Sequence, residues 1–128
     1  VEPLRNALKD AAPAVRMQTV MVIDGKRNRA LGLRLVSILE EETVPEVLRE
    51  VCYAVGRSGS SEGVQALIRM ASPGGKLFNK KGTQQRIWAV DGLRMAGGAV
   101  AREALEALVQ GADKEVRDAA EKALAGGG

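Results

Sequence analysis

Trp88 and Asp91 lie three residues apart, a spacing that places an aromatic ring and a carboxylate on one face of a helix. One further large aromatic side chain carries a polar group, that of Tyr53. Tryptophan and tyrosine are enriched at protein interfaces because they bury a large apolar area and still form hydrogen bonds. We therefore predict a protein-binding site that contains Tyr53, Trp88 and Asp91. The apolar pair Leu77 and Phe78 either joins this site or folds over Trp88 and covers it.

Basic residues gather around that apolar pair. Residues 57–94 contain seven basic side chains and two acidic ones, although the net charge of the whole chain is only +3. We predict that Lys76, Lys80, Lys81 and Arg86 bind an anion, namely an acidic protein, a phosphate group or a nucleic acid. A solvated loop that only keeps the protein soluble would carry the same charges. A nucleic-acid surface would also need aromatic side chains for base stacking, and only 2% of the residues are aromatic.

The chain lacks the residues on which most catalytic and metal sites depend. It contains no histidine, which is the commonest general base and metal ligand. The single cysteine, Cys52, cannot form an internal disulfide, and we expect it to be a buried apolar residue of a protein in a reducing compartment. No phosphate-binding loop or nucleophile motif is present. We predict a non-enzymatic, cytoplasmic protein without cofactor, metal or membrane span.

The elements that would position these residues are indicated by a pattern that occurs four times. In each copy an apolar segment precedes a short polar turn and a second apolar segment, and the second segments align without gaps. They span residues 15–23, 47–55, 85–93 and 116–124. Their apolar positions lie three and four residues apart, the spacing of an amphipathic helix. We predict an all-α fold, an α-solenoid of four stacked helix pairs, because neither helix of a pair can bury its apolar stripe alone.

The pattern also predicts where each repeat and helix lies. The repeats of this single domain, over residues 1–128, are expected at about 1–25, 26–59, 60–97 and 98–126, with an insertion at 72–82. The helices are expected over residues 1–9, 13–24, 28–41, 45–57, 61–71, 83–96, 99–110 and 113–125. The second helices are expected to end at Gly25, Gly56, Gly97 and Gly126. Trp88 aligns with Gln18, Glu50 and Ala119, two of which are polar, so we expect it to face solvent.

The aligned segments resemble HEAT repeats, in the short form that is also seen in phycobilisome-lyase-type proteins. The best copy of the family pattern is Val-Arg-x-x-Ala-x-x-Ala-Leu at residues 116–124. The resemblance implies a right-handed superhelix in which the second helix of each pair lines a concave groove. It also implies that the arginines at one aligned position, Arg16, Arg86 and Arg117, pair with an acid of an adjacent repeat. The candidate acids are Asp10, Asp113 and Glu115.

We expect a non-enzymatic scaffold that binds a partner protein through this concave face, while the basic insertion guides the partner electrostatically. One alternative is a protein that binds nucleic acid or another polyanion through the basic central segment. The other alternative, implied by the resemblance, is an enzyme subunit similar to the bilin lyases. A separate contact is expected at the N-terminal end, because residues 20–23 form an apolar run where a capping repeat would be polar. Neighbouring repeats of a longer solenoid or a partner chain would cover that run.

Overall fold

The computed structural model describes residues 12–26, 29–72, 82–111 and 113–126, and these residues form seven α-helices and no strand. The helices are α2 (Pro13–Lys26), α3 (Arg29–Glu41), α4 (Pro45–Ser58), α5 (Ser61–Ala71), α6 (Thr83–Ala96), α7 (Gly98–Gly111) and α8 (Lys114–Gly126). The expected first helix, over residues 1–9, lies outside the described residues. None of the described helices is long and apolar enough to cross a membrane.

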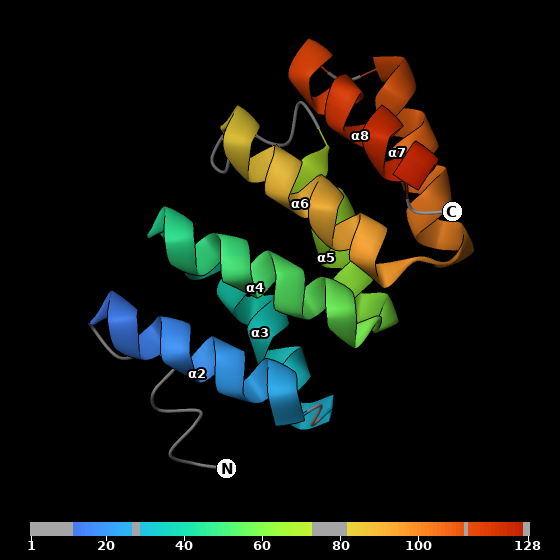
Figure 1. Cartoon of the computed structure of the whole chain (residues 1–128). Coiled ribbons are helices and arrows are strands. Elements are labelled where there is room, and N and C mark those ends of the chain that lie inside the picture. The colour runs from blue at the N-terminus through green and yellow to red at the C-terminus, as the bar shows by residue number, and fades with distance from the viewer. Residues whose placement is uncertain (1–11, 27–28, 73–81, 112, 127–128) are drawn as a thin grey trace.

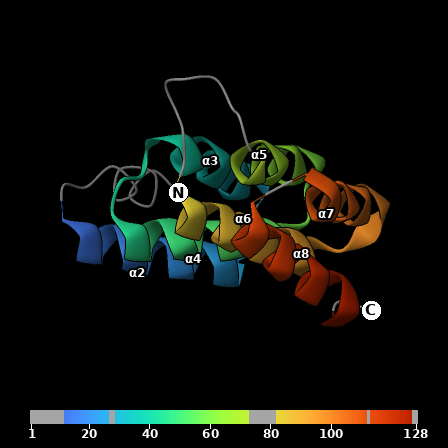
Figure 2. The same ribbon diagram turned by 90° about the horizontal axis from the view of Figure 1, so that it is seen from above.

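The helices are arranged in two layers (Figure 1). α2, α4, α6 and α8 lie side by side and form the front layer, which faces the viewer in Figure 1. α3, α5 and α7 form the back layer, which is separated from the front layer in Figure 2. Each back helix contacts two successive front helices. The fold is therefore an all-α solenoid of stacked helix pairs, as the repeated pattern predicts.

The observed helix ends follow the local sequence signals. α5 and α6 begin and end at the predicted residues. Ser60 caps α5, because its side-chain oxygen accepts a hydrogen bond of 3.0 Å from the backbone N–H of Gly63. The prediction that Gly56 ends a helix is wrong. α4 continues to Ser58, and Gly59, with φ at 66°, occupies the left-handed position that ends it.

The aligned positions of the front helices form the core. One aligned position carries Thr19, Val51, Ala89 and Ala120, and all four side chains are buried. Cys52 is fully buried, as predicted, and its thiol donates a hydrogen bond of 3.7 Å to the thioether sulfur of Met70. Because the same positions are buried in each repeat, the sequence alignment gives the correct packing register.

Gly56 has a packing role in place of the predicted terminating role. A Cβ atom at Gly56 would overlap the backbone carbonyl of Gly92 in α6. A Cβ atom at Gly92 would in turn lie 2.8 Å from the carbonyl oxygen of Cys52. The two glycines therefore let the backbones of α4 and α6 approach more closely than any other residue would allow.

Candidate functional site

Two of the aligned arginines link consecutive repeats. Arg16 of α2 lies 2.8 Å through Nε from Oε1 of Glu42, and 2.9 Å through Nη2 from Oε2 of the same carboxylate. Arg86 of α6 donates a hydrogen bond of 2.9 Å from Nη1 to Oδ2 of Asp113. The predicted pairing with an acid of an adjacent repeat is therefore confirmed at these two positions. In α4 the same aligned position carries the fully buried Leu48, which cannot form an ion pair.

The ion pair between Arg16 and Glu42 is largely buried. Burial by itself raises the pKa of Glu42, but it is outweighed by the hydrogen bond from Arg16, by those from the N–H groups of Val44 and Thr43, and by the charge of Arg16. The net effect is a pKa below the usual value for glutamate. Glu42 is therefore ionised at neutral pH and holds the entry to α4 against α2.

Of the four predicted anion-binding residues, only Arg86 belongs to the described part of the chain. Arg86 is 8% exposed, and its Nε donates a hydrogen bond of 3.2 Å to the carbonyl oxygen of Ala71. Its guanidinium therefore serves internal contacts, and the prediction that Arg86 binds an external anion is wrong. The other predicted residues of the insertion lie outside the described residues: Lys76, Leu77, Phe78, Lys80 and Lys81.

Tyr53 and Asp91 meet on the front layer. Tyr53 belongs to α4 and Asp91 to α6, and both side chains are half-buried. Burial raises the pKa of Asp91, and the charge of Arg94 and a hydrogen bond with the Tyr53 side chain only partly offset this. Burial and the nearby charge of Asp91 raise the pKa of Tyr53. Tyr53 and Asp91, two of the residues that the sequence predicts as a binding site, therefore lie close together across two repeats.

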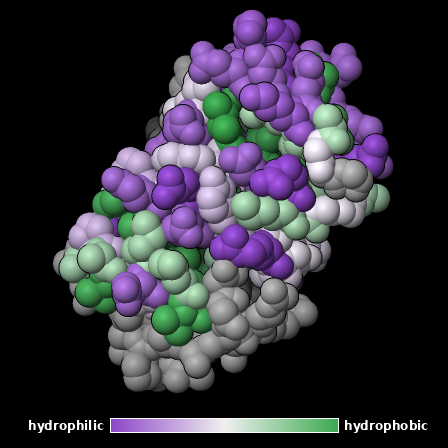
Figure 3. Space-filling view, viewed as in Figure 1, coloured by the Kyte–Doolittle hydropathy of each residue, from purple (hydrophilic) through white to green (hydrophobic). Residues whose placement is uncertain are grey.

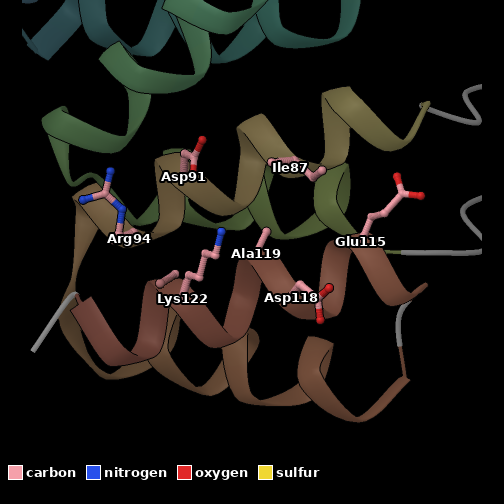
Figure 4. Close-up of a pocket in the computed structure, with 8 residues that line it drawn as sticks. Ile87, Asp91, Arg94, Glu115, Asp118, Ala119 and Lys122 are labelled. Carbon is pink, nitrogen blue, oxygen red and sulfur yellow. The ribbon is translucent and has the colours of Figure 1, made fainter.

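A pocket of about 310 Å³ opens beside this pair, between α6 and α8. Its lining consists of Ile87, Asp91 and Arg94 from α6 and of Glu115, Asp118, Ala119, Lys122 and Ala123 from α8 (Figure 4). The apolar members are small or half-buried, and they form the floor. The charged members surround them, and Lys122 points from α8 toward α6 in Figure 4. The pocket therefore combines an apolar floor with a rim of both charges.

Trp88 lies one helical turn before Gly92, the residue of α6 that approaches Cys52 of α4. In the alignment Trp88 and Gly92 occupy the positions of Ala119 and Ala123, and both alanines line the side of α8 that faces α6. Trp88 therefore shares a helix face with Gly92. It is half-buried against the core, so it is neither fully solvent-facing nor fully covered.

The comparisons with known proteins agree with this architecture. The sequence matches HEAT repeats over residues 1–77, which is more than half of the 128-residue chain. The chain belongs to the HEAT-repeat family. HEAT repeats generally mediate protein–protein interaction. No curated protein matches this HEAT-repeat chain, and its similarity to the phycobilisome-lyase type stays a prediction.

The front layer of the HEAT repeats presents a mixed surface. Figure 3 shows hydrophobic patches between hydrophilic side chains on this face, including one between α6 and α8. In the described part of the chain, no group of three aspartate, glutamate or cysteine side chains gathers as a metal site. Most of the pocket residues were not predicted from the sequence. The one usable signal is that α8 carries Ala119 at the position where α6 carries Trp88.

Proposed function

We propose that this HEAT-repeat protein is a non-enzymatic scaffold that binds a partner protein through its front layer, with the contact centred on Tyr53, Trp88 and Asp91. The observation that carries the proposal is that two half-buried side chains, Tyr53 of α4 and Asp91 of α6, lie close together next to the half-buried Trp88 and to an open pocket. Aromatic side chains in such partly desolvated surroundings contribute most of the binding energy at protein interfaces. The basic side chains of the insertion, Lys76, Lys80 and Lys81, guide an acidic region of the partner to this surface.

The charges of the front layer support a protein partner over a nucleic acid. The pocket rim carries three acids and two bases, whereas a nucleic-acid surface needs an excess of basic groups along the backbone path. Arg86, one of the seven basic residues of the central segment, is engaged inside the fold. A mixed rim around an apolar floor is typical of a protein interface.

The test is capture of proteins from a lysate of the source organism, with and without nuclease, quantified by mass spectrometry. Asp91→Arg places a like charge beside Arg94 on the front layer, and Glu103→Arg makes the same type of change on an exposed position of α7 in the back layer. We expect that proteins still captured after nuclease treatment bind wild type and Glu103→Arg. The same proteins should not be captured by Asp91→Arg or Trp88→Ala. Melting curves establish that each variant is folded. Capture that disappears with nuclease, or that all variants retain, would contradict the proposal.

A second contact is proposed at α2, where a helix of a neighbouring HEAT repeat packs. Val15 and Val22 are 40% and 43% exposed, and Figure 3 shows hydrophobic surface at this end. The side chains aligned with Val22 in α4 and α8, Ala54 and Ala123, are buried, and Ala123 lies on the side of α8 that faces α6. The register therefore supports a helix as the group that covers this face of α2. Val22→Lys should leave the fold intact and abolish any association through this end in sedimentation measurements.

A further inference from the structure

We propose that the pocket between α6 and α8 accepts one tryptophan-sized aromatic side chain, carried by a segment of the partner protein. This inference rests on the proposed scaffold function and adds the chemistry that the partner must present. It follows from a comparison of two equivalent contacts within the molecule, α4 with α6 and α6 with α8.

The two contacts use the same aligned positions but different side chains. At the contact of α6 with α4, the positions are occupied by Trp88 and Gly92. At the contact of α8 with α6, they are occupied by Ala119 and Ala123. The same aligned position therefore carries an indole in α6 and a methyl group in α8.

The open space lies where the aromatic ring is missing. Ala119 lines the pocket, and Trp88 at the equivalent position is packed half-buried against the core. The pocket volume of about 310 Å³ is at the low end of the range for ligand sites, roughly 300–1,000 Å³, so it suits a single side chain better than a larger ligand. From the indole at the aligned position we infer that an aromatic side chain fits the space beside Ala119.

The rim offers the polar partners that an indole requires. Asp118 is already paired with Lys114, whose Nζ lies 3.1 Å from Oδ2. Asp91 and Glu115 remain on the rim as acceptors for an indole N–H, which is a donor only. Lys122 points across the pocket in Figure 4, where its ammonium group would lie against the face of a bound ring. These features favour tryptophan over a purely apolar side chain.

The experiment is a titration of the isotope-labelled full chain with N-acetyl-L-tryptophanamide, followed by backbone amide NMR shifts. We expect saturable shifts at Ile87, Ala119 and Ala123. N-acetyl-L-alaninamide should bind about tenfold more weakly or not at all, because the aromatic ring supplies the anchor. Two variants complete the design. Ala119→Trp fills the pocket from within, and Ala107→Trp places the same residue on an exposed position of the back layer.

The inference predicts that Ala119→Trp abolishes the saturable shifts at Ile87 and Ala123, while Ala107→Trp keeps them. Ala119→Leu serves the same purpose if the tryptophan variant does not fold. Absence of saturable shifts around the pocket in wild type, or unchanged shifts in the filled variant, would overturn the inference. The scaffold function is judged separately, because it fails if capture disappears with nuclease or if Asp91→Arg and Trp88→Ala retain all nuclease-resistant partners.

Discussion

The contact between α4 and α6 is closed, whereas the equivalent contact between α6 and α8 is open. At the closed contact Gly56 and Gly92 allow the two backbones to touch, and Trp88, one turn before Gly92, is half-buried against the core. At the open contact Ala119 and Ala123 line a pocket, and the two repeats are joined by the ion pair of Arg86 with Asp113. One repeated framework therefore produces either a closed contact or an open pocket.

The difference teaches that a few side chains at fixed positions decide between these outcomes. The backbones differ on the two sides of α6, because Gly56 and Gly92 let α4 pack more extensively against α6 than α8 does. Leu48 takes the arginine position in α4, so the closed contact is held by apolar packing and not by charge. Close packing and open surface are thus found at different repeats of the same stack.

The largest expected effect comes from Gly56→Ala, which breaks the closed contact. The new methyl group would overlap the backbone of Gly92, which cannot move without separating α4 from α6. We expect the free energy of unfolding to fall by about 3 kcal/mol, as for a strongly overpacked core. Urea unfolding measures the loss. Gly111→Ala is the matched control, because a Cβ there meets no atom within 4 Å, and a change larger than about 0.5 kcal/mol in it would be unexpected.

Trp88→Ala should convert the closed contact into an open one. Because Trp88 is half-buried, we expect a loss of about 2 kcal/mol, less than the ~3–5 kcal/mol of a fully buried aromatic residue. The variant should also gain a second site for N-acetyl-L-tryptophanamide, detected as new amide shifts in α4 and α6. If the variant gains no such site, Trp88 does not fill the position that Ala119 leaves empty.

Acid should weaken the contact between α2 and α4 through Glu42. The folded-state pKa of Glu42 is lowered, so its stabilising contribution is complete above the unfolded pKa and is lost as the pH falls through the folded pKa. We expect the urea midpoint of wild type to drop over this acidic range by an amount that corresponds to about 1–2 kcal/mol. Glu42→Gln should be less stable at neutral pH and should show a flatter pH profile. Parallel profiles of the two proteins would show that Glu42 is not the group responsible.

The smallest expected effect concerns Asp91, whose raised pKa has the opposite consequence. The folded state disfavours the ionised carboxylate, so the cost to stability appears as the pH rises through the unfolded pKa and is complete above the folded one. Asp91→Asn should therefore be slightly more stable than wild type at neutral pH and equal to it in acid. Asp118→Asn, at an exposed rim position, should change little at either pH. Thermal melting at two pH values compares the stability of the two variants with that of wild type. If Asp91→Asn were less stable than wild type at pH 7, burial would not be disfavouring the ionised Asp91 carboxylate.

Much of the fold was predictable because each repeat restates the same pattern. Four aligned segments gave the helix positions, and the arginine position gave the pairing of Arg86 with Asp113. The role of Gly56 was not predictable, since a glycine near a helix end has the same sequence signature whether it ends the helix or contacts a neighbour. The assignment of Arg86 to an anion site failed because charge in a sequence does not reveal burial.

The pocket illustrates a different limit of sequence reasoning. Tyr53 and Asp91 could be proposed as site residues because both side chains carry polar groups, and the structure places them close together. The pocket next to them depends on Ala119, whose contribution is the absence of a larger side chain. An absence becomes informative only when a structure shows an open pocket beside Ala119 and the aligned Trp88 half-buried against the core.

The central claim, that the front layer is the binding surface, is tested most directly by site-specific photo-crosslinking. A photoreactive phenylalanine analogue would replace Lys122 on the rim of the α6–α8 pocket or, in a second protein, the exposed Ala107 on the back layer. After nuclease treatment of the lysate and irradiation, the account predicts a discrete partner adduct from position 122 that Asp91→Arg suppresses, and none from position 107. An adduct that forms from position 107 and not from position 122 would contradict it.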